Sequence, residues 1–504
     1  MRASKRAGKA LILALFSVAV AACDRGSPFG SGNEVSAASL EAQAKDPQVR
    51  AFYEARQWQP AWDEDSEKAL TSIIGEAMAH GLKPSLFLKE DAPSDHKAAR
   101  EVALTKAALR YADALARGYS DPAKLGRTYT IPRATADVAS GLAQALQDRK
   151  VEAWFASLVP QTDEYRALSQ AHQRLVQQAA KADSAKIPEG EALKPGARDP
   201  RVASIAATLT AMGYLPEQVD PSARYSPVLV AAVKALQADN GMKPDGIVGP
   251  ATLEALNAGP ATRARQLAVA MERLRWLPRD PPGTRIDVNT GAAFLDYYRG
   301  GRLVDQRRVV VGEPGWETPQ LKSNMTQLVA NPVWRVPDSI LEDELSKKSG
   351  AYLAANGFEW RDGRLVQRSG DKNSLGRVKF DLDNKKAIYL HDTPAKALFG
   401  QDERHRSHGC IRVHDALQFA AMLASESGVR DELEKALAEG DEGYVKLKGE
   451  IPVRLLYHTA FWDGARIQFR PDVYGWDDDV AAAIGLVRGG PRKPHQRRPA
   501  DLGP

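Results

Sequence analysis

The chain has 504 residues, a formal net charge of +5 and two cysteines, Cys23 and Cys410. A chain of this length exceeds the ~100–200 residues of a typical single domain, so we expect three or more units. The net charge is small and basic residues are interleaved with acidic ones, which argues against a nucleic-acid-binding protein. We expect no disulfide between the two cysteines.

The first 23 residues have the form of an export signal. A basic stretch, residues 2–9, precedes an apolar segment, residues 10–22, that is too short for a comfortable membrane span. Residues 20–23 resemble a bacterial lipobox, which implies cleavage before Cys23, lipidation of its thiol, and anchoring at the surface of the inner or outer membrane. The alternative is an ordinary signal peptide cut near Ala22. Both interpretations predict an exported protein.

Helical periodicity dominates residues 24–181. Within residues 70–78, apolar side chains recur at the spacing of a helix with one buried face. A second helix, rich in Ala and Leu, is expected at about residues 96–117. Residues 182–198 are rich in charge, Ala, Gly and Pro, which predicts a linker.

Residues 199–259 predict a compact helical module. Ser226 is an expected N-cap, with Pro227 at the first helical position, where a missing N–H costs nothing. Residues 232–237 (AVKALQ) and 245–250 (DGIVGP) resemble the peptidoglycan-binding domain 1 family. The resemblance implies a small helical module that binds cell wall, and a spacer that has kept the fold is the alternative.

From Arg285 onward the pattern changes to the alternation typical of strands. Residues 293–298 and 303–311 are expected to form a hairpin with Gly300 and Gly301 at its turn. Residues 338–372 are polar and helical again, and an insertion of this size suggests a lid. The predicted fold class is multidomain α+β: a helical N-terminal scaffold, a small helical wall-binding module, and a mostly β catalytic domain with a helical lid insertion.

Cys410 is the candidate nucleophile, within residues 407–413 (SHGCIRV). An unperturbed thiol with a pKa of about 8.5 is only a few per cent ionised near neutral pH, so it needs a base. His391 follows an apolar, strand-like run and is the favoured base, while His408, two residues from the thiol, is the alternative. Gly409 lets the backbone approach a substrate closely, and amides near the nucleophile can point at a developing oxyanion.

Residues 389–394 (YLHDTP) and 406–413 (RSHGCIRV) resemble the L,D-transpeptidase catalytic domain, also called YkuD-type. The resemblance covers about residues 285–448, and the upstream regions resemble the large, scaffold-bearing periplasmic subclass. It implies Cys410 as nucleophile, His391 as the group that accepts and later donates the proton, and the Asp392 carbonyl as the group that orients the imidazole.

The same resemblance implies an oxyanion site and substrate contacts. His408 and the amides of Gly409 and Cys410 would line the oxyanion site, and Arg412 is a candidate for binding a substrate carboxylate. Further predicted substrate-binding residues are Ser407, Tyr389 and Trp334, with core packing as the alternative for the last two. Imidazole and thiolate also suit zinc. However, the motif already gives roles to His391, His408 and Cys410, so we expect neither a metal nor a cofactor.

The implied function is peptidoglycan L,D-transpeptidation in the periplasm, with roles in cell-wall organisation and cell shape. The partners would be the stem peptides of peptidoglycan, a tetrapeptide donor and an acceptor stem, joined by 3→3 cross-links with release of D-alanine. The family also implies acylation by carbapenems. One alternative is an L,D-carboxypeptidase or cross-link hydrolase acting on the same stems, and another is a non-catalytic wall-binding lipoprotein.

These expectations divide the chain into six parts. They are a lipoprotein-type signal peptide (1–23), the helical scaffold (24–181), the linker (182–198), the peptidoglycan-binding module (199–259), the catalytic domain (260–480) with its lid at about 338–372, and a tail (481–504). Lys and Arg alternate with Pro in the tail, which cannot build a core, so we expect a disordered basic segment.

Overall fold

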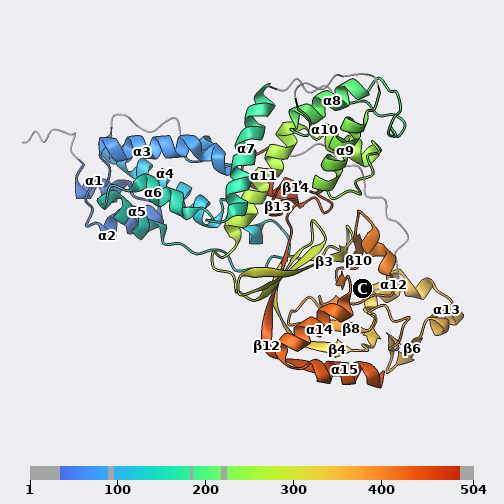
Figure 1. Ribbon diagram of the computed structural model, residues 1–504. Coiled ribbons are helices and arrows are strands. Elements are labelled where there is room, and N and C mark those ends of the chain that lie inside the picture. Colours follow the sequence, from blue (N-terminus) through green and yellow to red (C-terminus); the bar gives the residue numbers. More distant parts are fainter. Residues whose placement is uncertain (1–34, 89–95, 182–185, 217–223, 488–504) are drawn as a thin grey trace, which may run out of the picture.

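The computed structural model of the chain describes residues 35–88, 96–181, 186–216 and 224–487. The predicted signal peptide with Cys23 lies outside the described residues, as does most of the predicted basic tail. Figure 1 shows a helical arm, a second helical unit above it, and a strand-rich unit below. These units correspond to the scaffold, the wall-binding module and the β domain predicted from the sequence.

The N-terminal region is helical, as predicted. Its helices are α1 (Ala37–Gln43), α2 (Pro47–Ala55), α3 (Glu64–Gly75), α4 (Lys97–Arg117), α5 (Val138–Gln147), α6 (Val151–Leu158) and α7 (Asp163–Lys181). The apolar faces of α1 to α6 meet in one core, which includes Phe52, Leu70, Leu109 and Leu142, whereas α7 packs in a separate cluster with α11. The burial of these faces, rather than helix propensity alone, stabilises such short helices.

The wall-binding module contains α8 (Val202–Ala211), α9 (Pro227–Asp239) and α10 (Pro250–Asn257). Ser226 caps α9 by accepting a hydrogen bond from Leu229 N, which confirms the predicted helix start. The predicted linker is partly integrated in this module, because Ile187 and Leu193 are buried in its core. The side-chain amide of Asn257, in α10, also donates a hydrogen bond to the Ile187 carbonyl at 2.9 Å. The apolar residues within the charged stretch therefore attach it to the module.

A long helix, α11 (Gly259–Trp276), connects the module to the β domain and packs along α7. Arg275 is fully buried on α11 and lies 2.6 Å from Glu272 and 2.8 Å from the Tyr165 hydroxyl of α7. The predicted start of the catalytic domain at residue 260 thus falls inside a helix that packs on the scaffold. The chain returns to the scaffold at its other end, where α16 (Trp476–Ala483) contacts α11 and Ile484 joins the scaffold core.

The β domain is a closed sheet. Its strands are β1 (Arg285–Asn289), β2 (Phe294–Arg299), β3 (Arg302–Gly312), β4 (Leu321–Ala330), β8 (Val378–Leu382), β9 (Leu390–His391), β10 (His405–Ser407), β11 (Ile411–Val413) and β12 (Gly443–Leu456). Their order is β10-β3-β11-β9-β8-β4-β12-β1-β2, and β2 also pairs with β3, which closes the ring. The predicted β2–β3 hairpin is confirmed, with Gly300 and Gly301 at positive φ. Two helices, α14 (Ala416–Ser427) and α15 (Arg430–Glu439), pack against the sheet.

The insertion predicted at residues 338–372 is mixed rather than wholly helical. It contains α12 (Asp338–Asp343), α13 (Gly350–Ala355), and the strands β6 (Phe358–Arg361) and β7 (Arg364–Gln367), which pair with β5 (Trp334–Arg335). Asp362 and Gly363 both have positive φ and form the β6–β7 turn. An Asp-Gly pair at a two-residue turn is a strong hairpin signal, so the β6–β7 hairpin could have been predicted from the sequence.

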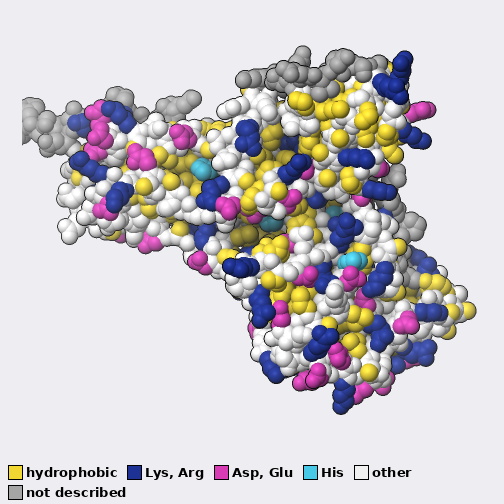
Figure 2. Space-filling model, viewed as in Figure 1, with side chains coloured by type: hydrophobic (Ala, Val, Ile, Leu, Met, Phe, Trp, Pro, Cys, Tyr) yellow, Lys and Arg dark blue, Asp and Glu magenta, His cyan; other side chains and the backbone are white. Residues whose placement is uncertain are grey.

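A final hairpin, β13 (Ala460–Trp462) and β14 (Ile467–Phe469), lies between the β domain and the helical units. Figure 2 shows basic and acidic side chains interspersed over the visible face rather than gathered in one patch of a single sign. Among the residues that the structure describes, no helix is both long and apolar enough to cross a membrane.

Candidate active site

The pairing of two short strands brings the predicted catalytic residues together. Strands β9 and β11 run parallel, with Leu390 opposite Ile411 and His391 opposite Arg412. Leu390 and Ile411 point into the core of the closed sheet. Because side chains alternate along a strand, the residues that flank them point to the opposite face. Cys410, Tyr389, His391 and Arg412 therefore share that face, although 19 residues separate His391 from Cys410 in the chain.

His391 is fully buried at the end of β9. Its Nδ1 lies in hydrogen-bonding contact with the backbone carbonyl of Asp392. A carbonyl oxygen only accepts hydrogen bonds, so this contact requires the proton on Nδ1. In the neutral ring Nε2 then carries a lone pair, which is the state that a proton acceptor needs.

Asp392 is itself held in place by its side chain. Its carboxylate accepts a hydrogen bond from Arg377 N at 2.9 Å and pairs with Lys396. Gly376 packs against this carboxylate so closely that an added Cβ would lie 2.3 Å from Oδ2. The contacts of the Asp392 side chain thus fix the position of the Asp392 backbone carbonyl, which accepts the hydrogen bond from His391.

The Cys410 thiol is 5 % exposed, and its Sγ lies 3.8 Å from the carbonyl of Ala387. Burial raises the pKa of this thiol to about 11, while contact with Tyr389 and the charge of Lys379 lower it by smaller amounts. The free protein therefore holds a protonated thiol at neutral pH. Such a thiol becomes a nucleophile when a base removes its proton, and a nearby imidazole can act as that base.

Tyr389 links the thiol to the insertion. Its ring lies edge-on to the His391 ring at 5.7 Å between centroids, and Lys379 Nζ lies 4.9 Å from the Tyr389 ring centroid. Tyr389 also packs against the apolar core of the insertion, which contains Trp334 and Phe358. Trp334 is almost fully buried in that core, so in this state its ring contributes packing.

His408 meets a residue of the insertion that the sequence analysis did not single out. Its Nε2 lies 3.0 Å from Oε1 of Glu344, which follows α12. The ring also packs edge-on against Trp316, with centroids 4.9 Å apart. The insertion therefore contributes a carboxylate directly to the loop that carries Cys410. Glu344 is 64 residues away in the chain, and no local pattern marks it.

The loop before Cys410 is shaped by hydrogen bonds to its backbone. Ser407 is fully buried, and its hydroxyl donates to the Cys410 carbonyl at 2.6 Å and accepts from Gly409 N at 3.2 Å. Gly409 has φ +108°, a conformation that L side chains rarely adopt. In this state the Gly409 amide is engaged by Ser407, and the hydroxyl of Ser407 supports the loop from within.

A second support comes from residues far away in the chain. Thr318 Oγ1 donates to the Gly409 carbonyl at 2.8 Å and accepts from Gly312 N at 2.9 Å. The Tyr474 hydroxyl accepts from Thr318 N at 3.3 Å and donates to the Gly312 carbonyl at 2.6 Å. Thr318 and Tyr474 were missed from the sequence because they reach the loop only through the closed fold.

Arg412 is fully buried on β11, opposite His391 and Val310. Its charge contributes to lowering the pKa of Cys410. His405 lies in β10, and its Nε2 contacts the Thr290 carbonyl at 2.9 Å. Within the described part of the chain, no cluster of three or more His, Cys, Asp or Glu side chains is arranged to hold a metal ion.

Comparison with protein families supports the three-part organisation. Residues 283–444 match the "L,D-transpeptidase catalytic domain", residues 47–171 the "Scaffold domain", and residues 198–256 the "Putative peptidoglycan binding domain". The predicted resemblance is confirmed, and Cys410, His391, His408 and Arg412 all lie within the catalytic-domain match. Residues 283–444 are thus similar to L,D-transpeptidase catalytic domains.

One curated relative is a "Putative L,D-transpeptidase" of Haemophilus influenzae, 32% identical over 244 residues, which covers 44% of this chain and 49% of the relative. The chain thus spans about half the length of that relative. Solved structures with some likeness include an L,D-transpeptidase from Mycobacterium smegmatis (14% identity, TM-score 0.20, 34% of this chain and 58% of that one). Another is an L,D-transpeptidase from Xylanimonas cellulosilytica (16% identity, TM-score 0.16, 53% and 98%). These TM-scores are too low to support an argument about the fold.

Proposed function

We propose that the protein is a peptidoglycan L,D-transpeptidase that forms 3→3 cross-links through an acyl-enzyme on Cys410. The observation that carries the proposal is the β9–β11 register, which presents Cys410, His391 and Tyr389 on one face. The match of residues 283–444 to the L,D-transpeptidase catalytic domain supports the choice of reaction. The match of residues 198–256 to a peptidoglycan-binding domain supports the choice of substrate.

In the first half-reaction, the Cys410 thiol gives its proton to Nε2 of His391 as sulfur attacks the carbonyl between diaminopimelate and the terminal D-alanine. The other ring nitrogen, Nδ1, keeps its proton and donates it in a hydrogen bond to the Asp392 carbonyl, and this bond stabilises the imidazolium that forms. The C–N bond breaks, His391 returns the proton to the leaving amine, and D-alanine departs. A thioester remains on Cys410.

In the second half-reaction, an amine of a neighbouring stem attacks the thioester carbonyl. His391 accepts a proton from that amine, the C–S bond breaks, and the proton returns to sulfur, so the thiol is regenerated and a new amide joins the two stems. Donors near the loop would stabilise the oxyanion of each tetrahedral intermediate. The Gly409 amide is shared with Ser407 in this state, so we assign this role to the Cys410 amide and His408.

The insertion would act as a lid over the donor stem. It supplies Glu344 to His408 and packs its core against Tyr389, so its position is coupled to the groups around the thiol. Exclusion of water by such a lid favours attack by an amine over hydrolysis. The proposal also includes a periplasmic location, a lipid anchor at Cys23 and acylation by carbapenems, which present a strained lactam to the same thiol.

The test uses muropeptide analysis of digested sacculi from cells in which this protein is the sole source of 3→3 cross-links. We expect Cys410→Ala and His391→Ala to abolish the 3→3 muropeptides. His414→Ala is the matched control, because His414 directly follows β11, its side chain is half-exposed, and it pairs with the exposed Asp415. Unchanged cross-link levels in Cys410→Ala would contradict the proposal. Trimmed tripeptide stems without cross-links, produced with acceptor stems supplied, would identify a carboxypeptidase instead.

A carbapenem provides an independent readout. We expect the intact protein to gain the mass of one carbapenem, and Cys410→Ala to gain none. Absence of the adduct from the unsubstituted protein would favour the non-catalytic wall-binding alternative.

A further inference from the structure

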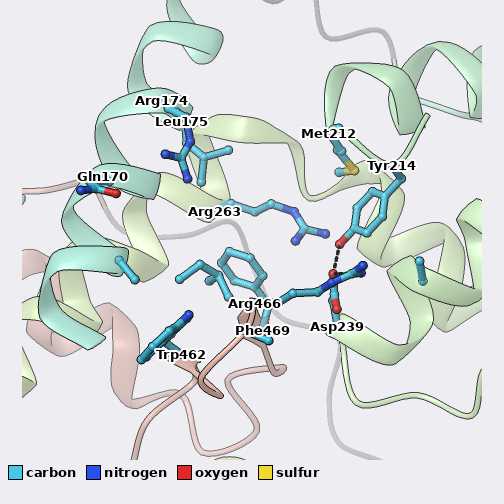
Figure 3. Close-up of a pocket in the computed structure, with 15 residues that line it drawn as sticks. Gln170, Arg174, Leu175, Met212, Tyr214, Asp239, Arg263, Trp462, Arg466 and Phe469 are labelled. Carbon is cyan, nitrogen blue, oxygen red and sulfur yellow. Dashed lines mark hydrogen bonds and ion pairs between the residues drawn. The ribbon is translucent and has the colours of Figure 1, made fainter. Parts of the chain in front are cut away.

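A cavity of about 530 Å³ lies away from Cys410, where three parts of the chain meet. Helix α7 of the scaffold forms one wall, the wall-binding module forms the second, and the β13–β14 hairpin forms the third (Figure 3). Its volume falls within the ~300–1,000 Å³ typical of sites for small ligands or short ligand segments. Neither the wall-binding module nor the catalytic domain contains this cavity alone.

Basic side chains dominate the polar lining. Figure 3 shows Arg174 extending from α7, Arg263 crossing the middle, and Arg466 near Asp239. Asp239 accepts a hydrogen bond from the Tyr214 hydroxyl at 2.9 Å and lies 3.7 Å from Arg466. The charged side chains of the lining are thus three guanidinium groups and one carboxylate, so the cavity carries a net positive charge.

Arg263 is the most informative of these residues. It is 4 % exposed, and its guanidinium lies 4.6 Å from the centroid of the Phe469 ring. One terminal nitrogen donates to the Ala255 carbonyl at 3.0 Å, whereas the buried Nε has no hydrogen-bond partner within the described residues. The Arg263 guanidinium forms no ion pair with a carboxylate among the described residues, and burying a charge without a counter-charge is costly, so an anionic ligand in the cavity would compensate it.

The apolar part of the lining is aromatic. Trp462 of β13 and Phe469 of β14 form the hairpin wall, and Tyr214 faces them from the module. A site with rigid aromatic walls and a few convergent guanidinium groups suits a ligand that has both apolar surface and carboxylates. This combination describes an acidic peptide better than a neutral sugar chain.

The module is also tied to the catalytic domain next to this cavity. Lys243 N donates to the Asp402 carboxylate at 3.0 Å, and Asp402 lies in the segment between His391 and Cys410. Arg470, which follows β14, donates to the Asp239 carbonyl of α9 at 3.2 Å. A chain bound in the cavity would therefore be held in a fixed position relative to the catalytic domain.

We propose that this cavity is a second binding site for the carboxylates of a peptidoglycan stem peptide, distinct from the site at Cys410. The choice of ligand rests on the proposed function, because stem peptides carry several carboxylates on a short chain. The cavity would bind one stem peptide of a glycan strand while another stem reacts at Cys410. It would therefore position the polymer rather than take part in the chemistry.

The experiment measures binding of the full chain carrying Cys410→Ala, which removes turnover, to three probes. The probes are intact sacculi, glycan strands stripped of their peptides, and the free tetrapeptide. We expect binding to sacculi and to the tetrapeptide, and at least tenfold weaker binding to stripped glycan. In this background, Arg174→Glu combined with Arg466→Glu should weaken binding to sacculi about tenfold or more, because two attractive charges become repulsive. Trp462→Ala should weaken it in the same direction.

Arg224→Glu is the matched control, because Arg224 is an exposed arginine of the same module that does not line the cavity. Unchanged binding in the cavity variants, an equal loss in Arg224→Glu, or equal binding of stripped glycan would each overturn the proposal. Carbapenem acylation of the same variants with Cys410 intact shows that the fold and the thiol site survive, and we expect an unchanged rate. Failure of the proposed function would appear differently, as absence of acylation in the unsubstituted protein.

Discussion

Glu344 of the insertion lies 3.0 Å from Nε2 of His408, two residues before Cys410. The contact joins a segment inserted in the sheet to the loop that carries the thiol. The side chain of His408 is nearly fully buried at this point, and that of Glu344 is 15 % exposed. A charge-assisted hydrogen bond in such a place is stronger than one at the surface, so it can fix the ring orientation.

The first prediction concerns this contact. Glu344→Ala should slow acylation of Cys410 by a carbapenem by about tenfold, because His408 loses the carboxylate that orients its ring. Glu344→Gln should recover part of the rate, since an amide oxygen can still accept the hydrogen bond. Stopped-flow acylation measures both. Glu342→Ala is the control, because Glu342 is exposed on α12, two residues before Glu344, and an equal loss of rate in that variant would contradict a specific role for Glu344.

The second prediction concerns Thr318, which joins Gly312 to the Gly409 carbonyl. Thr318→Val keeps the shape but removes both hydrogen bonds, so we expect a loss of about 1–3 kcal/mol in the free energy of unfolding. Acylation of Cys410 should slow as well, because the loop loses its support. Thr318→Ser keeps the hydroxyl and should retain most of the rate. Thermal unfolding and acylation rates test this, and a normal rate in Thr318→Val would show that Ser407 alone fixes the loop.

The sequence predicted the elements whose signals are local. The Gly300-Gly301 turn, the cap at Ser226 and the approximate positions of most helices were readable because turn and cap residues act on their immediate neighbours. The β6–β7 hairpin was readable too, because Asp362-Gly363 carries the turn signal, but the polar residues around it gave the segment a helical appearance.

The sequence could not predict the contacts that depend on closure of the sheet. Cys410 and His391 were found through their motif, but their shared face follows from the β9–β11 register, which sequence spacing does not determine. Glu344, Thr318 and Tyr474 reach the loop from 64 or more residues away, and none of them stands in a distinctive local pattern. Likewise, Ile187 looked like a linker residue because its neighbours are charged, and only the module's core shows why it is apolar.

The third prediction concerns the joint between scaffold and α11. Arg275→Met leaves Glu272 buried without its guanidinium partner, so the free energy of unfolding should fall by about 3–5 kcal/mol. Combining it with Glu272→Gln should restore part of the loss, because the uncompensated charge is removed. Chemical denaturation followed by tryptophan fluorescence measures the change. Arg430→Met, in an exposed pair with Glu434, should cost less than about 1 kcal/mol. A similar loss in both arginine variants would contradict the argument from burial.

The last prediction concerns the ionisation of Cys410. Burial raises the pKa of the thiol to about 11, so at pH 7 only a very small fraction of the molecules carries the thiolate. In a soluble form that begins at residue 35, Cys410 is the only cysteine, so alkylation by iodoacetamide reports on it alone. The alkylation rate should rise about tenfold per pH unit from pH 7 to 10. The unfolded chain should instead approach a plateau above pH 8.5. A folded protein whose alkylation is already maximal at neutral pH would show a preformed thiolate–imidazolium pair and would contradict the neutral resting thiol. In that case burial would not be the dominant influence on the thiol, and proton transfer to His391 would precede substrate binding rather than accompany attack.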